Sequence, residues 1–206
     1  GTPQSLPQFE GSPKKVVVGQ GIDLDFLPTC QNACADTTRL LVVHRLSRSK
    51  RLELCIRALT QLHNQYTLDV YGIEAEPQYV AELRELVKTL NLGHRVVFHG
   101  TVPMNRLPEI YTRHRLILNM ASETIDKTML EAMTCGCYPV TTNANAMAIG
   151  IPAAPAEDTP EAIAAFVQKY ADHAPLSPEQ MYSVVNEGHS LHGLIVKMDS
   201  YMHKGD

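Results

Sequence analysis

Along this chain, segments with continuous apolar runs alternate with segments in which apolar residues recur every three or four positions. Residues 40–44 read Leu-Leu-Val-Val-His, a nearly continuous apolar run of the kind that forms a strand buried on both faces. Residues 52–62 instead place Leu52, Ile56 and Leu59 three or four positions apart, which is the spacing of one helix face. Because the same change of period recurs down the chain, the sequence predicts strands that alternate with helices.

The strand pattern recurs between residues 40 and 142. Strands are predicted over residues 40–44, 66–71, 95–99, 116–119 and 138–142. Helices are predicted over residues 52–62, 77–90, 107–113, 128–135 and 159–170, and two more begin near residues 177 and 191. Strands and helices that alternate in this way require right-handed crossovers. The predicted fold is therefore α/β, with a Rossmann-like, doubly wound, mainly parallel sheet.

The ends of the chain differ from this alternating region. Residues 1–13 contain three prolines and two glycines, which indicates a flexible lead-in or a remnant of expression. Residues 14–38 are predicted as a crossover between domains, with a short strand over 14–23 and a polar linker over 28–38. Residues 39–206 are predicted to form one Rossmann-like domain with C-terminal helices.

Composition excludes several classes of function. The net charge is −4 with both signs mixed, so no basic stripe for nucleic acid is present. No apolar run approaches the roughly 20 residues that span a bilayer. The chain has five cysteines, an odd number, and their spacings supply too few ligands for a zinc site. We therefore expect no metal and no disulfide framework, and a cytoplasmic protein with reduced thiols.

Candidate ligand-binding residues follow the predicted strands. Ligands of open α/β sheets bind beyond the carboxyl ends of the strands. Arg45 follows the first predicted strand, Gly72 the second, residues 100–102 the third and Glu123 the fourth. These positions predict one site at a single edge of the sheet.

The segment 122–140 carries the clearest chemistry. Glu123 and Glu131 lie eight positions apart, with Glu131 inside a short predicted helix. The start of a helix presents unpaired N–H groups and a positive dipole, which favour an anion such as a diphosphate. A carboxylate one turn further can accept hydrogen bonds from the vicinal hydroxyls of a ribose. The pattern indicates a site for a sugar nucleotide.

Three motifs resemble those of the retaining family-four glycosyltransferases, also called group 1 glycosyl transferases. The first is Glu123-x7-Glu131, followed by Ala-Met-x-Cys-Gly-x-x-Pro-Val at residues 132–140. The second is the Arg45-x4-Lys50 spacing after a buried strand, and the third covers residues 95–111. The resemblance extends over residues 16–201. It implies the C-terminal half of the two-domain GT-B fold, which binds the nucleotide-sugar donor.

The resemblance also implies roles for individual residues. Arg45 and Lys50 would hold the diphosphate and stabilise it as it leaves, and Glu123 would act with them in catalysis. The remaining residues would bind the donor: Glu131, Thr128, Asp126, Lys127, Gly72, Gly100, Val102 and His44. Gly100 and Val102 would frame the base through their backbone. A side-chain cap of the helix is an alternative role for Asp126 that needs no ligand.

The reaction implied is transfer of a hexose from a UDP- or GDP-sugar to a glycan or lipid-linked acceptor, with no cofactor. An N-terminal acceptor-binding domain would be missing here, so this fragment is expected to bind the donor without turning it over. The full-length enzyme would be cytoplasmic, and a place at the cytosolic face of a membrane stays open.

One loop departs from the family pattern. The family has glycines and an aromatic residue after the first glutamate, whereas residues 124–127 read Thr-Ile-Asp-Lys. This departure supports an alternative in which the domain is a degenerate, non-catalytic module for binding or assembly. A sugar-nucleotide epimerase or a phosphorylase on the same fold is a further alternative. No lysine is recognisably placed for the pyridoxal cofactor of a phosphorylase.

Overall fold

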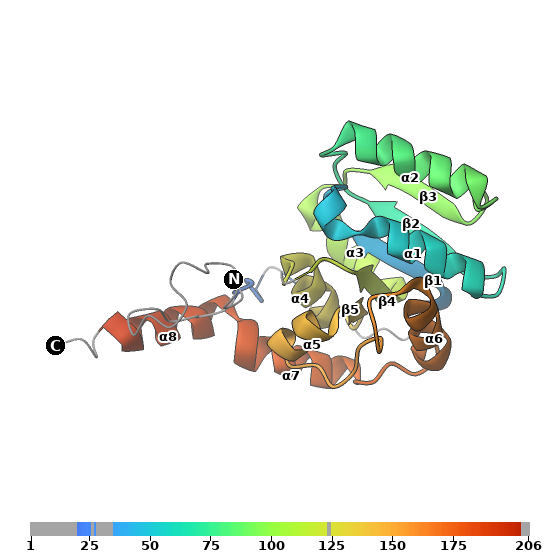
Figure 1. Ribbon diagram of the computed structural model, residues 1–206. Coiled ribbons are helices and arrows are strands. Elements are labelled where there is room, and N and C mark those ends of the chain that lie inside the picture. Colours follow the sequence, from blue (N-terminus) through green and yellow to red (C-terminus); the bar gives the residue numbers. More distant parts are fainter. Residues whose placement is uncertain (1–19, 26, 28–34, 123–124, 203–206) are drawn as a thin grey trace.

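The computed structural model describes residues 20–25, 27, 35–122 and 125–202 (Figure 1). Within these residues, parallel strands form one sheet in the order β3-β2-β1-β4-β5. The strands are β1 (Asp36–Val43), β2 (Thr67–Tyr71), β3 (Val96–Gly100), β4 (His114–Asn119) and β5 (Tyr138–Thr141). The predicted doubly wound, Rossmann-like fold class is confirmed.

Helices connect the strands and follow the last one. They are α1 (Leu52–Ala58), α2 (Pro77–Thr89), α3 (Leu107–Thr112), α4 (Lys127–Thr134), α5 (Asn143–Ile149), α6 (Pro160–Tyr170), α7 (Pro178–His189) and α8 (Leu191–Met202). Short 3-10 turns, η3 (Arg48–Lys50), η4 (Leu59–Gln61) and η5 (Met104–Arg106), lie between them. The predicted helix over 52–62 divides into α1 and η4. Helix α5 was not predicted, because its Asn-Ala-Asn-Ala-Met-Ala sequence lacks an apolar face.

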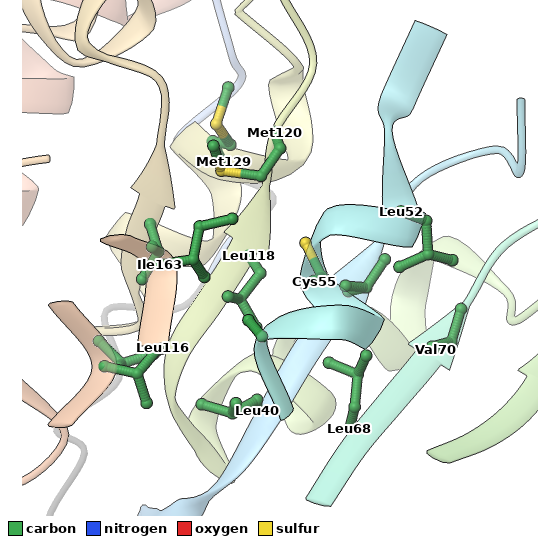
Figure 2. Packing of buried hydrophobic residues seen from close by; sticks show 14 of the residues in the cluster. Leu40, Leu52, Cys55, Leu68, Val70, Leu116, Leu118, Met120, Met129 and Ile163 are labelled. Atoms are coloured by element: carbon green, nitrogen blue, oxygen red, sulfur yellow. The ribbon is translucent and has the colours of Figure 1, made fainter. Parts of the chain in front are cut away.

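Alternating side chains of β1 enter two separate cores. Leu40 and Val42 pack with residues of α1, α2 and α6, whereas Leu41 and Val43 pack with residues of α3 and α4. Figure 2 shows part of the larger core, where Leu40, Leu68 and Leu116 of neighbouring strands lie near Cys55 of α1 and Ile163 of α6. Helices therefore cover both faces of the sheet, which explains the continuous apolar runs of its strands.

The segment that precedes the domain differs from its prediction. Strand β1 begins at Asp36, so the last residues of the predicted linker 28–38 belong to the sheet. The Asp36 carboxylate accepts hydrogen bonds from the backbone and hydroxyl of Thr38, which holds this polar start in place. Most of the predicted strand 14–23 lies outside the described residues. Its end, Ile22, forms an isolated parallel bridge with Ser190.

The C-terminal helices divide into a packed helix and a projecting one. Helix α7 packs against α4 and α5, while α8 extends away from the sheet (Figure 1). Leu191, Ile195 and Met198 of α8 are exposed, as are Val196 and Tyr201. None of the helices in the described part is long and apolar enough to cross a membrane.

A buried carboxylate, Asp69 of β2, connects four strands. Arg39 of β1 donates to its Oδ2 from Nε and Nη2 at 3.1 and 2.6 Å. His99 of β3 and His114 of β4 place Nε2 atoms 2.5 and 3.1 Å from its two oxygens. Burial alone would raise the pKa of Asp69, but the hydrogen bonds from His114, His99 and Arg39 outweigh it and hold the pKa well below its usual range. The carboxylate therefore stabilises the fold as an anion.

We predict that Asp69→Ala lowers the free energy of unfolding by about 3 kcal/mol at pH 7, because it leaves the buried His114 and the partly exposed Arg39 and His99 without their acceptor. The native pKa lies below the value of about 3.9 expected in the unfolded chain. The stabilisation is therefore complete above about pH 5 and is lost as the pH falls below 4. Urea unfolding at pH 7 and pH 3 measures this.

The control for this prediction is Asp172→Ala, which removes an exposed aspartate. It should change stability little at either pH. A loss for Asp69→Ala that is equally large at pH 3 and pH 7 would contradict the assignment of a stabilising anion.

Candidate functional site

The two basic residues after β1 have different surroundings. Arg45 is exposed, and its side chain has no hydrogen bond or ion pair with any described residue. Lys50 is buried, and its Nζ lies 2.6 and 2.7 Å from Oδ1 and Oδ2 of Asp126. Both follow the carboxyl end of β1, as predicted, but only Arg45 presents an uncompensated charge there.

Asp126 occupies the N-cap position of α4 without capping it. Its backbone is extended, with φ −78° and ψ 136°, yet its side chain accepts no hydrogen bond from the first turn of the helix. The carboxylate instead bonds Lys50 and accepts from Asn119 Nδ2 at 2.7 Å. The alternative role of a side-chain cap is therefore wrong, because Lys50 and Asn119 occupy the carboxylate.

The first turn of α4 contains two further predicted residues. The hydroxyl oxygen of Thr128 is buried and has no hydrogen-bond partner among the described residues. Lys127 is exposed. A hydroxyl of this kind at a helix start can donate to an anion, and the helix dipole favours such an anion.

His44 is buried at the end of β1. Its Nδ1 lies 3.0 Å from the carbonyl oxygen of Arg45, and its Nε2 has no partner in the described part of the chain. Burial lowers the pKa of His44 to about 4, so the ring is neutral at pH 7. Because Nδ1–H donates to the Arg45 carbonyl, Nε2 of the neutral ring is an acceptor, so His44 offers an anionic phosphate neither a positive charge nor a hydrogen-bond donor.

The predicted glycine after β2 is explained by backbone packing. A Cβ atom on Gly72 would lie 1.8 Å from the carbonyl oxygen of His44, so no other residue fits. Its N–H donates to the carbonyl of Gly100 at 2.8 Å, which joins the ends of β2 and β3. Val102 is half-buried against the smaller core. These residues shape the loops at the sheet edge.

A pocket of about 310 Å³ lies beside α4. Its lining consists of Gly21, Ile22, Asp23, Leu27, Met104, Leu107, Lys127, Glu131 and Leu191. Of the predicted site residues, the structure brings Glu131 and Lys127 together here. Arg45, Lys50, Asp126, Thr128, Gly72, Gly100, Val102 and His44 do not line it.

Glu131 is the polar centre of this pocket. The Tyr111 hydroxyl donates to its Oε2 at 3.2 Å, and Oε1 has no hydrogen bond to any described residue. Burial raises the pKa of Glu131, while the Tyr111 hydrogen bond and the charge of Lys127 act in the opposite direction. Tyr111 thereby orients a carboxylate that keeps one oxygen for a ligand.

The pocket wall formed by residues 21–23 was missed by the sequence analysis. Ile22 accepts a hydrogen bond from the backbone of Leu191 at 2.8 Å and donates one to His189 at 2.9 Å. A Cβ on Gly21 would lie 2.9 Å from the Leu194 side chain, so a glycine permits this close approach. The Gly-Ile-Asp sequence was recognised as a crossover, but its pairing with a segment almost 170 positions later leaves no local signal.

Glu123 lies outside the described residues. In the described ranges, no group of three or more His, Cys, Asp or Glu side chains is placed to hold a metal ion.

We predict that burial of neutral His44 makes stability depend on pH. The unfolded chain, with a histidine pKa of about 6.5, takes up a proton before the native state does. Stability is therefore complete above about pH 7 and falls by up to about 1.4 kcal/mol per unit between pH 6.5 and 4. Urea unfolding at pH 7 and 5 should show wild type losing about 1–2 kcal/mol more than His44→Phe.

The exposed His94 provides the control for this measurement. His94→Gln should keep the pH dependence of the wild type. Equal pH dependence in wild type and His44→Phe would show that the ring is not held neutral in the native state.

Comparison with solved structures shows what this fold is similar to. HepE from Anabaena, solved with UDP and glucose, has a TM-score of 0.75 at 18% identity over 89% of this chain and 55% of its own. Sucrose-phosphate synthase from Thermosynechococcus elongatus has a TM-score of 0.79 at 19% identity, over 98% of this chain and 55% of its own. A glycosyltransferase from Rickettsia africae has a TM-score of 0.76 at 17% identity, over 90% and 56%.

The chain thus spans about half the length of these structures. A comparison with curated proteins found no match. The family model described as glycosyl transferases group 1 matches residues 31–153, more than half of the chain. This match covers the sheet and α1 to α5, and with them Arg45, Lys50 and Glu131, so the chain belongs to the group 1 glycosyl transferases.

Proposed function

We propose that this domain binds the nucleotide-sugar donor of a retaining glycosyltransferase, which moves a hexose from a UDP- or GDP-sugar to a glycan or lipid-linked acceptor. The observation that carries the proposal is the pocket of about 310 Å³ in which the half-buried Glu131 faces apolar side chains. Its volume lies at the lower end of the range of about 300–1,000 Å³ for small-molecule sites.

The nucleoside would occupy this pocket. The free oxygen of Glu131 can accept hydrogen bonds from the vicinal hydroxyls of a ribose. Met104 and Leu107, which line the same pocket, supply apolar surface for a base. The solved complex of HepE with UDP and glucose supports a donor of this class.

The diphosphate would lie between the pocket and the end of β1. Arg45 is exposed there with no partner among the described residues, and α4 begins there with the Thr128 hydroxyl, which also lacks a described partner. The first N–H groups of a helix have no partner within the helix and favour an anion. Charge-assisted hydrogen bonds of this kind contribute roughly 1.5–3 kcal/mol each. Arg45, with Lys50 and Glu123, would stabilise the diphosphate as the bond to the sugar breaks, without a metal.

An N-terminal acceptor-binding domain would complete the enzyme. This chain covers only 55% of two matched structures, and α8 carries the exposed apolar residues Leu191, Ile195 and Met198. A second domain packed on α8 would bury them, and it would supply the acceptor site and the activation of the acceptor. This chain alone would then bind the donor without turnover. We place the enzyme in the cytoplasm, with a membrane-linked acceptor as one option.

A specific observation favours a second candidate, a domain that binds without catalysing. Lys50, half of the predicted diphosphate clamp, is neutralised by Asp126 in the loop that departs from the family pattern. If that ion pair persists with donor bound, the clamp is incomplete. Binding of a nucleotide with no transfer by the full-length protein would support this candidate.

We predict that UDP or GDP binds with micromolar to millimolar affinity and that Glu131→Ala weakens binding about tenfold or more, because it removes the acceptor for the ribose hydroxyls. Calorimetric titration with UDP, GDP and ADP measures this and identifies the base. The control is Glu161→Ala, in the first turn of α6 and away from the pocket. Unchanged affinity in Glu131→Ala would contradict the assignment of the nucleoside pocket.

We also predict that Arg45→Ala weakens UDP binding about tenfold while uridine binding stays unchanged, because Arg45 contacts only the diphosphate. Its stability should match that of the wild type, since the side chain is exposed and has no described partner. Titration with UDP and with uridine separates the two contributions. The control Arg84→Ala removes an exposed arginine of α2; a comparable loss in that variant would indicate a general charge effect.

A further inference from the structure

The ion pair between Lys50 and Asp126 is nearly enclosed by the protein. The side chain of Lys50 is 7% exposed and that of Asp126 is 18% exposed. Both carboxylate oxygens lie within 2.7 Å of Nζ, and Asn119 Nδ2 donates to one of them. The pair joins the segment after β1 to the start of α4, so it lies at the carboxyl edge of the sheet.

The side chain of Asp126 does not cap α4, although Asp126 occupies the N-cap position. An aspartate at an N-cap ordinarily accepts a hydrogen bond from the N–H of the second or third helical residue. Here the side chain makes no such bond, and the Thr128 hydroxyl in the same turn lacks a partner among the described residues. The helix start is therefore left free for an anion while its own carboxylate neutralises Lys50.

A diphosphate at this edge and the Asp126 carboxylate need the same cation. Two anions at one ammonium group repel each other, and the repulsion is strong where water is largely excluded. Because Asp126 is part of the chain, it acts as a competitor at a high effective concentration. A ligand reaches Lys50 only by displacing this carboxylate, and the uncapped first turn of α4 offers the displaced side chain new donors.

We propose that Asp126 is an intramolecular competitor of the ligand's diphosphate for Lys50, an autoinhibitory contact that sets how strongly the site holds phosphate. This inference rests on the proposed donor site, because it takes the diphosphate to lie at this edge. The contact penalises diphosphate-containing ligands and leaves the affinity for the nucleoside unaffected. Lys50 contributes to binding only when Asp126 has moved away.

The test compares wild type with Asp126→Asn. The variant keeps the shape of the side chain and removes its charge. It should bind UDP and inorganic diphosphate about tenfold or more tightly than wild type, with unchanged affinity for uridine. Asp158→Asn is the matched control, since it removes a carboxylate that pairs with Arg51, the neighbour of Lys50, at 2.7 Å. It should leave all three affinities unchanged.

A second substitution tests whether the increased affinity of Asp126→Asn depends on Lys50. Adding Lys50→Met to Asp126→Asn should abolish the gain for UDP and for inorganic diphosphate. Thermal unfolding confirms that each variant is folded, and Asp126→Ser, which can cap α4, takes the place of Asp126→Asn if that variant is unstable. A gain that persists without Lys50 would overturn the proposal.

The outcomes separate this inference from the proposed function. If folded Asp126→Asn and Asp126→Ser bind inorganic diphosphate no more tightly than wild type, the ion pair serves only to stabilise the fold. The inference is then overturned, regardless of the affinities measured for nucleotides. If inorganic diphosphate gains affinity but Glu131→Ala leaves UDP binding unchanged, the competitor is supported and the nucleoside pocket is wrong.

Discussion

The carboxylate of Asp69, on β2, accepts hydrogen bonds from side chains of three other strands and so connects four strands of the sheet. Arg39, His99 and His114 reach it from β1, β3 and β4. Since all described strands run parallel, a common register brings their carboxyl ends to one edge. A buried charge is retained only where its partners compensate its desolvation, and here those partners come from the elements that carry the site loops.

The site at that edge has two parts with different physics. The part around Glu131 is an apolar pocket with one oriented carboxylate, suited to a group with vicinal hydroxyls. The part around Arg45 and Lys50 is electrostatic, and half of its charge is already neutralised by Asp126. The shape of the pocket and the desolvation of the ligand would determine binding in the first part. In the second part, binding would depend on competition between the ligand's anion and Asp126 for Lys50. A ligand that spans both parts would be recognised by each on separate grounds.

One wall of the pocket includes a backbone contact between segments far apart in the sequence. Residues 21–23 pair with residues 189–191, directly before α8 leaves the body of the domain (Figure 1). These segments, far apart in the sequence, therefore form one wall of the pocket beside Glu131.

The sequence by itself determined the alternation of strands and helices, because buried parallel strands and helix faces have different hydrophobic periods. It also placed Arg45 after a strand and Glu131 in a helix that follows a predicted site loop, and it assigned the family through short motifs. It missed α5, which lacks an apolar face, and it placed the start of β1 too late because Asp36 and the threonines read as a linker.

Only the tertiary structure decided how these residues are used. The capture of Lys50 by Asp126 joins side chains 76 positions apart, and the wall of residues 21–23 joins segments even more distant in the sequence. The close approach of the His44 carbonyl, which requires a glycine at position 72, is likewise decided by the tertiary structure. Periodicity and motifs report on neighbours along the chain, whereas ion pairing and close backbone approach depend on which distant groups share a buried volume.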